Sequence, residues 1–342
     1  METIISVDDV SFSYGTSSEQ ALKHISLDVN KGDFIGIIGP SGAGKSTLAA
    51  CLSGAVPHHY TGTFFGSVMV DGHDTCEVSL TDVSQIVGSV LQDIDTQMVA
   101  SVVEDEMLFG LENFGVPHDQ IEQRVSETLE TVGISDLRDR EIATLSGGQK
   151  QKVAIAAILA MRPRVLVLDE PTAALDPASS TLVFETLREA NRALGITIVV
   201  VEQKVALLSE YCNRVLVLNH GEIALQGEPH EVFAHTDELR IIGVDCPRVT
   251  RIFNSLEADG LASGTPCLDV DEAERLITGI VDPALATSDT QVPAGSPHAP
   301  SLRPHAKEAE PVLTFEHVEF AYPHGGAAVH DLNLTLYPGE LV

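Results

Sequence analysis

Gly39-Pro-Ser-Gly-Ala-Gly-Lys45-Ser46-Thr47 is the stretch that decides the fold of this chain. It matches the pattern of Gly, any four residues, then Gly-Lys-Ser/Thr, whose backbone N–H groups can surround phosphate oxygens. The apolar run Phe34–Ile38 precedes it and predicts a strand, whereas Leu48–Leu52 follows it and predicts a helix. A loop between a strand and a helix N-terminus is the setting that phosphate binding requires. We therefore expect Lys45 to reach the β- and γ-phosphates of a nucleotide and the Ser46 hydroxyl to bind Mg²⁺.

Short apolar runs alternate with longer helical patterns beyond this loop. The runs predicted as strands are Phe34–Ile38, Val165–Leu168, Ile196–Val201 and Val215–Leu218, and the stretches predicted as helices are Val153–Met161 and Ser179–Leu194. Strands that are apolar on both faces belong to parallel sheets covered by helices. The alternation therefore predicts an α/β fold.

Two acids, Asp169 and Glu170, follow the apolar run Val165–Leu168. At the end of a buried strand, the first carboxylate is expected near the metal. The second is expected to face the γ-phosphate, where it could polarise a water molecule. An ordinary acidic strand end in a very acidic chain is the other interpretation, and the nearby phosphate loop argues against it.

A third motif, Leu145-Ser-Gly-Gly-Gln149, opens a predicted helix. Ser146 can cap that helix, and Gly147 and Gly148 permit close approach to the backbone. Taken alone, the motif reads as a Gly-rich turn, because phosphate-loop enzymes in general do not need it.

In combination, these motifs resemble the nucleotide-binding domain of ABC ATPases. Leu145–Gln149 matches the family's signature, Gly39–Thr47 its Walker A loop and Val165–Glu170 its Walker B strand. Gln92 matches the Q-loop, and Ala174-Leu-Asp176-Pro matches the D-loop. The resemblance implies a mainly parallel sheet with flanking helices, an N-terminal antiparallel β subdomain and an inserted helical subdomain.

The resemblance also implies a head-to-tail dimer, in which each ATP lies between the Walker motifs of one domain and the signature of the other. Glu170 would be the general base, and Gln92 would position water or Mg²⁺. The metal would be held by Ser46, Gln92 and Asp169. The residues that the resemblance assigns to ATP are Tyr14, which would stack on adenine, together with Gly39, Pro40, Ser41, Gly42, Ala43, Gly44, Lys45, Ser46, Thr47, Ser146, Gly147, Gly148, Gln149 and Asp176.

One departure from the family pattern concerns catalysis. The family expects a His shortly after the run Ile196–Val201, where this chain has Gln203. A Gln can donate a hydrogen bond to the γ-phosphate but cannot carry a positive charge. We therefore predict slow or impaired hydrolysis at this domain's own site, while a partner's site completed by this chain's signature could remain competent.

Finer features resemble the ATPases of energy-coupling-factor importers: Gln92–Gln97, Ala100–Glu106, Phe109–Asn113, and Gly54–His58 ahead of Gly66–Gly72. In that class two ATPase domains, sometimes fused, sit under a transmembrane coupling subunit. A separate membrane subunit captures a vitamin or a transition-metal ion. The resemblance implies a peripheral protein at the cytoplasmic face of the cell membrane, with the coupling-subunit groove between the Q-loop and the signature.

Composition argues against nucleic acid as a partner. The 342 residues include 50 Asp and Glu against 20 Lys and Arg, a formal charge of −30. Such a surface repels phosphate backbones, although it also serves solubility. A soluble tandem ABC ATPase acting on ribosomes or DNA is therefore the second hypothesis. No stretch approaches the roughly 18 to 20 apolar residues of a membrane span, so a transporter role needs separate membrane subunits.

The domain organisation is expected to include a repeat. We predict an ABC domain at residues 1–240, a small extension at 241–285 and a Pro/Ser/Ala/His-rich flexible linker at 286–311. Val312–Tyr322 then parallels Ile4–Tyr14, so residues 312–342 are predicted to be the truncated start of a second ABC domain. The alternatives are two hairpins that converged, or a hydrolysis-impaired remnant.

Overall fold

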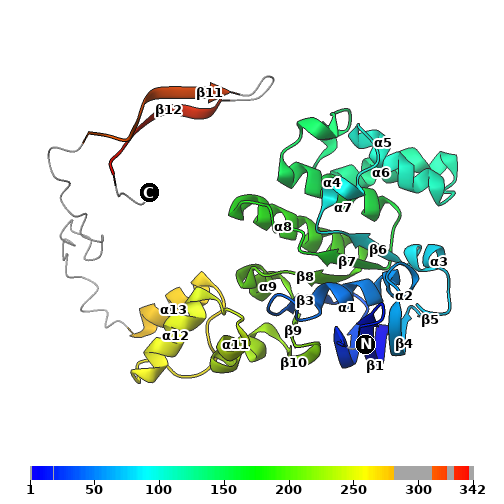
Figure 1. Ribbon diagram of the computed structural model, residues 1–342, viewed down its shortest axis with the longest axis horizontal. Helices are drawn as coiled ribbons and strands as arrows, with labels where there is room; N and C mark the ends of the chain where they lie inside the picture. The colour runs from blue at the N-terminus through cyan, green and yellow to red at the C-terminus, as the bar shows by residue number, and fades with distance from the viewer. Residues whose placement is uncertain (1, 18, 281–309, 322–326, 339–342) are drawn as a thin grey trace. The chain divides into compact units, whose positions relative to one another are not determined.

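The computed structural model describes residues 2–17, 19–280, 310–321 and 327–338. The chain divides into two units, Met1–Asp282 and Pro283–Val342, which are described separately (Figure 1).

The first unit is organised around a six-stranded sheet in the order β10-β9-β3-β8-β7-β6. Its strands are β3 (Phe34–Ile38), β6 (Val87–Val90), β7 (Val165–Asp169), β8 (Thr197–Val201), β9 (Arg214–Asn219) and β10 (Glu222–Gly227). All neighbours are parallel except β10, which pairs antiparallel with β9 at the edge. The mainly parallel sheet predicted from the apolar runs is confirmed.

Helices cover both faces of this sheet, and the side chains of β7 alternate between the two cores. Val165 and Val167 join the core that contains α1 (Lys45–Leu52), whereas Leu166 and Leu168 join the core formed with α7 (Gly147–Ala160) and α8 (Pro177–Leu194). This alternation is the two-residue period of a strand. It explains why the buried strands read as continuous apolar runs.

A second sheet, in the order β2-β1-β4-β5, is antiparallel. Its strands are β1 (Thr3–Tyr14), β2 (Leu22–Asn30), β4 (Gly62–Val70) and β5 (His73–Asp74). Helix α1 contacts β4 of this sheet as well as β7 and β8 of the large sheet, so the phosphate-loop helix links the two. This is the antiparallel N-terminal subdomain that the resemblance implied.

Helices are inserted between β6 and α7 (Figure 1). They are α4 (Ile94–Gln97), α5 (Val103–Asn113) and α6 (His118–Val132), with 3₁₀ turns at Ser135–Leu137 and Ile142–Thr144. Elsewhere the first domain has α2 (Ala55–His58), α3 (Leu80–Ser84) and α9 (Val205–Tyr211). The inserted helical subdomain is therefore present where it was expected.

Two helices begin earlier than their apolar patterns suggested. The apolar pattern of α7 starts at Val153, but the helix begins at Gly147. Ser146 caps it, as the signature motif predicted, and forms a capping box with Gln149. Helix α8 was predicted from Ser179 but begins at Pro177, where proline fits the first helical position. Capping residues and proline mark the N-terminal ends of these helices, and such residues do not belong to the apolar periodicity.

The C-terminal part of the first unit is helical. It contains α10 (Pro229–Ala234), α11 (Thr236–Ile242), α12 (Arg248–Ala258) and α13 (Val270–Ile280). Helices α12 and α13 lie within the predicted extension 241–285 and share a small core around Phe253, Cys267 and Ala273.

The described part of the second unit is one hairpin, formed by β11 (Leu313–Ala321) and β12 (Ala327–Leu336). Val318 faces Leu332 across it, as Val10 faces Ile25 in the first unit. The predicted linker 286–311 lies outside the described residues except at its last two positions. Tyr322, the last residue of the stretch that parallels Ile4–Tyr14, and residues 339–342 also lie outside them.

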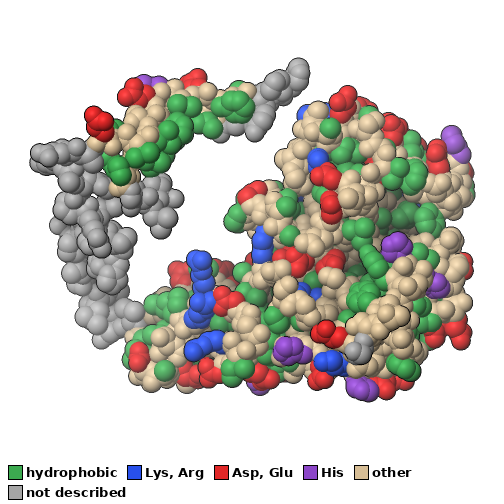
Figure 2. All heavy atoms as spheres, viewed as in Figure 1, with side chains coloured by type: hydrophobic (Ala, Val, Ile, Leu, Met, Phe, Trp, Pro, Cys, Tyr) green, Lys and Arg blue, Asp and Glu red, His purple; other side chains and the backbone are tan. Residues whose placement is uncertain are grey.

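Acidic side chains outnumber basic ones in this chain, whose formal charge is −30. Figure 2 shows Asp and Glu side chains spread over the viewed face rather than gathered in one patch. Among the described residues, no helix is both long and apolar enough to cross a membrane.

Candidate functional site

The phosphate loop lies between β3 and α1, as its sequence setting predicted. Gly44 holds a φ of 100°, and a Cβ there would stand 2.5 Å from the Ala21 carbonyl oxygen, so only glycine fits. The Lys45 side chain is almost fully buried, and its ammonium donates to the carbonyl oxygens of Gly39 and Pro40 at 2.9 Å each. The cation therefore lies directly over the loop that would surround phosphate oxygens.

Tyr14 stands beside this loop. Its hydroxyl shares a hydrogen bond of 2.9 Å with the Thr47 hydroxyl, while 40% of the residue remains exposed. Its ring meets the ring of Tyr60 edge-on, with centroids 6.2 Å apart. An exposed aromatic ring anchored to the phosphate loop can stack on a base, and Tyr60 is a neighbour that the motifs did not reveal.

Asp169 ends β7 next to the first residues of α1. Burial raises the pKa of its carboxyl above the usual value, while the Ser46 hydroxyl and the Lys45 ammonium oppose that rise. Its Oδ1 atom is buried and has no hydrogen-bond partner within the chain. A buried carboxylate oxygen without a partner, next to a hydroxyl, fits the oxygen ligands that Mg²⁺ prefers. Ser46 and Asp169 are thus the residues of this site that could hold the metal.

Glu170 follows in an unusual backbone conformation, with a φ of 49°, which turns its side chain out of the strand. Two amides meet its carboxylate. Gln203 Nε2 donates to Glu170 Oε1 at 2.6 Å, and Gln92 Nε2 donates to Glu170 Oε2 at 3.4 Å. The structure therefore brings together three predicted catalytic residues that lie far apart in the sequence.

A second glutamine shapes the loop that carries Gln92. Gln97 accepts a hydrogen bond from the Leu91 N–H at 2.9 Å and donates one to the Ser89 carbonyl oxygen at 3.0 Å. These bonds close the turn between β6 and α4. The exposed Gln92 is therefore carried by a loop with a defined path.

The signature residues form a unit at the start of α7. The Gln149 N–H donates to the Ser146 hydroxyl at 3.3 Å, and the Ser146 N–H donates to Gln149 Oε1 at 3.0 Å. A Cβ on Gly148 would lie 3.1 Å from the Cβ of Ser179, so this helix start packs closely on α8. The predicted contact of Ser146, Gly147 and Gly148 with a partner's ATP stays a prediction.

Asp176 caps α8. Its carboxylate accepts from the Ser179 N–H at 3.0 Å and from the Ser179 hydroxyl at 2.5 Å. These hydrogen bonds hold the pKa of Asp176 below its usual value. Its assignment to ATP binding stays a prediction, since the carboxylate is engaged by its own helix.

Four residues around the switch position were missed by the sequence analysis: Thr172, Ser180, Glu202 and Lys204. Thr172, Ser180 and Glu202 are buried, and Thr172 donates to Glu202 at 2.5 Å. The signal that could have found two of them is the pair of charged residues that flank Gln203 directly after an apolar strand.

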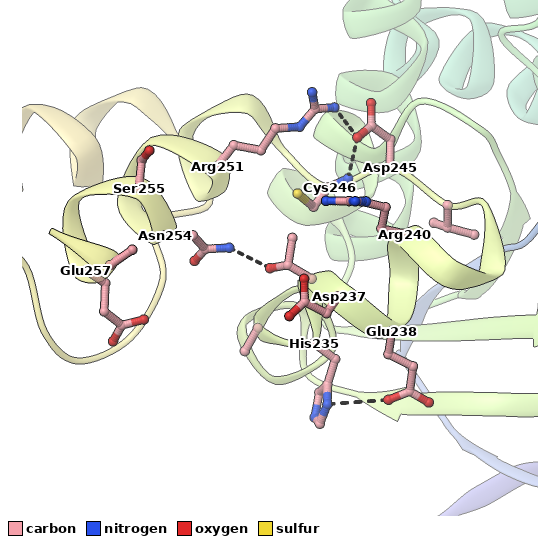
Figure 3. A pocket seen from close by; sticks show the side chains of 14 residues that line it. His235, Asp237, Glu238, Arg240, Asp245, Cys246, Arg251, Asn254, Ser255 and Glu257 are labelled. Carbon is pink, nitrogen blue, oxygen red and sulfur yellow. Dashed lines mark hydrogen bonds and ion pairs between the residues drawn. The ribbon is translucent and has the colours of Figure 1, made fainter.

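A cavity of about 1120 Å³ lies elsewhere, between α11 and α12. In Figure 3, Arg251 points toward Asp245, and Asn254 points toward α11. The wall of this cavity mixes acidic and basic side chains and includes two ion pairs, Arg251 with Asp245 and His235 with Glu238. None of the nucleotide-motif residues lines it, so it is not the candidate site.

Comparisons with known proteins agree with the motifs. The family model described as "ABC transporter" matches residues 22–173. The energy-coupling factor transporter ATP-binding protein EcfA1 of Clostridium perfringens is 39% identical over 276 residues, which are 79% of this chain and 96% of that protein. A putative ABC transporter ATP-binding protein of Methanosarcina acetivorans is 33% identical over 345 residues, covering 99% of this chain and 55% of that protein.

A solved structure is also similar. It is CbiO1 of Clostridium perfringens, described as part of the ABC transporter complex CbiONQ. The TM-score is 0.64 at 34% identity, and the match covers 75% of this chain and 100% of that one. The predicted fold, a phosphate-loop α/β domain of this type, is confirmed.

Proposed function

Because this chain belongs to the ABC transporter family of ATP-binding proteins, we propose that it is the ATPase subunit of an importer of the energy-coupling-factor type. ATP hydrolysis coupled to membrane transport is the activity of its family. The observation that carries the proposal is the meeting of Gln92 and Gln203 on Glu170, beside the phosphate-loop lysine. That arrangement can activate water, and not only bind a nucleotide.

The proposed mechanism assigns a task to each residue. The loop amides and Lys45 bind the phosphates, and Tyr14 stacks on the adenine. Ser46 and Asp169 would hold Mg²⁺, which would neutralise charge on the phosphates, and Gln92 is the third ligand that the family resemblance implies. Glu170 accepts the proton of the attacking water, and the Gln92 amide orients that water.

The proposed active state is a sandwich of two ABC domains. Ser146 and its glycine neighbours then contact ATP held by the other domain. A fused second domain is supported by the hairpin of the second unit. There, His317 pairs with Asp331 at 2.6 Å, where the first unit pairs Asp9 with His24 at 2.7 Å. The same interaction, with its two partners exchanged, occurs at equivalent positions of the two hairpins.

The proposed partners are a transmembrane coupling subunit and a membrane subunit that captures a vitamin or a transition-metal ion. We propose that the chain works at the cytoplasmic face of the membrane as a peripheral subunit. The segment between β6 and α7 exposes Leu91 and Val99 on its loops and Phe109 on α5, and these side chains suit an apolar partner.

Purification of the native protein from its own cells in a gentle detergent tests this function. Recovery of one or two small polytopic membrane proteins, with ATP hydrolysis that depends on Glu170, is the expected result. Recovery of ribosomal or DNA-repair proteins without a membrane partner would instead favour the soluble tandem ATPase.

Changing Gln203 to His is expected to raise ATP turnover about fivefold to tenfold, because charge-assisted hydrogen bonds are roughly twice as strong as neutral ones. The gain should be larger at pH 6.5 than at pH 8.5, because the charged imidazolium is populated near and below its ordinary pKa of about 6.5. Steady-state phosphate release measures both effects. Gln123→His on the exposed face of α6 is the control. An unchanged rate, with Glu170→Gln inactive, would reject the predicted impairment.

Changing Asp169 to Asn is expected to raise the thermal midpoint of the nucleotide-free chain by a few degrees at neutral pH. Burial raises the pKa of Asp169, so the folded chain holds this proton more tightly than the unfolded chain does. The ionised carboxylate therefore destabilises the folded chain at a pH above the pKa of Asp169 in the folded state. The difference in thermal midpoint between Asp169→Asn and the wild type should vanish as the pH falls below the ordinary pKa of an Asp carboxyl. The same variant should lose the Mg²⁺-dependent part of stabilisation by ATP.

Calorimetry with and without Mg²⁺ measures both effects, and Asp119→Asn on α6 is the control. An Asp169→Asn variant that keeps the full Mg²⁺ effect would remove Asp169 from the proposed metal site.

A further inference from the structure

The segment that carries Gln203 is held in place by the charged residues on either side of it. Glu202 is 1% exposed. Its Oε1 atom accepts from the Gln203 N–H at 2.8 Å and from the Lys204 N–H at 3.2 Å. Its Oε2 atom accepts from the hydroxyl of Thr172, which lies on the loop after β7. The carboxylate therefore sets the backbone path at the switch position.

Lys204 extends from the same segment to the same loop. Its ammonium donates to the carbonyl oxygens of Thr172 at 2.8 Å and Leu175 at 3.1 Å, and to the Ser180 hydroxyl at 2.7 Å. All three acceptors are uncharged. The bonds thus span the loop from Thr172 to the first turn of α8.

That loop connects the proposed general base Glu170 with the N-terminus of α8. It starts at Glu170, whose Oε1 atom accepts from Gln203, and it ends at Asp176, which caps α8. Leu175 also touches the start of the signature helix, since a Cβ on Gly147 would lie 3.2 Å from its side chain. A movement of this loop would therefore displace both the acceptors of Lys204 and the Leu175 side chain at the start of the signature helix.

We propose that Lys204 is a positioning residue that holds the loop 171–176 against the segment 202–204 and so keeps the Gln203 amide on Glu170. A shift of the loop then moves Gln203 relative to Glu170 through the Lys204 ammonium. Charged donors make the stronger hydrogen bonds in proteins, and three of them from one ammonium make a stiff link. The proposal rests on the proposed ATPase function for its kinetic part only.

Two measurements on the purified full chain test this role. In Lys204→Met, amide hydrogen exchange should become faster in peptides covering 171–178 and 202–205 and stay unchanged in α5 and α6. With MgATP, kcat should fall about tenfold while the Kd for ATP changes less than twofold. Lys204→Arg should recover most of both properties, because it keeps a charged donor. Lys31→Met is the control, and it removes a lysine that pairs with Glu2.

If Lys204→Met fails to fold, Ser180→Ala is the second variant. It removes one acceptor of the Lys204 ammonium and should produce a smaller increase in exchange in the same peptides. Faster exchange throughout the chain, or no local change in 171–178, would overturn the proposal. So would a loss of ATP affinity equal to the loss of kcat. A wild-type chain that binds but never hydrolyses ATP would reject the proposed function alone, because the exchange comparison would still decide the role of Lys204.

Discussion

Replacing Glu170 with Gln is expected to abolish ATP hydrolysis while ATP binding is kept. The carboxylate is the only group of the Gln92–Glu170–Gln203 set that can accept a proton from water at neutral pH. General-base catalysis contributes about a hundredfold to ten-thousandfold, so turnover should fall by at least two orders of magnitude. The amide keeps the size of the side chain, and the phosphate loop is untouched. Phosphate release and calorimetric binding of ATP measure the two properties.

The matched control for this variant is Glu130→Gln, an exposed position on α6. It should leave both turnover and binding as they are in the wild type. A Glu170→Gln variant that turns over ATP at a tenth of the wild-type rate or faster would contradict the role of general base. Base activity would then have to come from another group or from the substrate itself.

Replacing Lys45 with Met is expected to weaken ATP binding about tenfold to a hundredfold. Hydrogen bonds to charged groups are worth about 1.5–3 kcal/mol each, and one lost bond corresponds to a change of this size. The loss is enhanced by the surroundings, because Asp169 and Glu170 act on Lys45 and would remain as unbalanced negative charges near the phosphates. Isothermal titration of the full chain with MgATP measures the affinity.

Lys31→Met serves as the control here too, because that lysine lies on the turn between β2 and β3. Thermal unfolding without nucleotide should show that Lys45→Met still folds, since burial already lowers the pKa of Lys45 and makes the cation costly to keep. An affinity within threefold of the wild type would mean that the loop amides alone bind the phosphates.

The parallel sheet could be predicted because short runs of neighbouring apolar residues indicate its buried strands. Val165–Leu168 is apolar at every position, and a strand covered on both faces requires that. The phosphate loop is equally local, since its glycines are needed for the φ values of its own turn. The start of α7 was predicted by the Ser146 cap of the signature motif. The start of α8 was displaced in the prediction because an Asp176 cap and a proline, not apolar periodicity, mark it.

Local sequence patterns do not predict the side-chain contacts within the candidate site. Gln92 and Glu170 are 78 residues apart, and Gln203 and Glu170 are 33 apart. The motifs named these residues, but no spacing in the chain indicates that both amides meet one carboxylate. The role of Gln203 as a replacement for His came from the family resemblance, and its catalytic consequence stays a prediction.

Chain-local chemistry alone therefore specifies the phosphate loop, the buried strands and the signature cap, because each depends on neighbours within a few residues. The tertiary structure decides which side chains lie together at the carboxyl ends of the parallel strands. Neighbouring parallel strands β7 and β8 end together, so Glu170 meets Gln203 and the loop after β7 meets Lys204. The left-handed φ at Glu170 and the buried carboxylate of Glu202 set these side-chain directions, and both arise from packing between segments that are distant in the sequence.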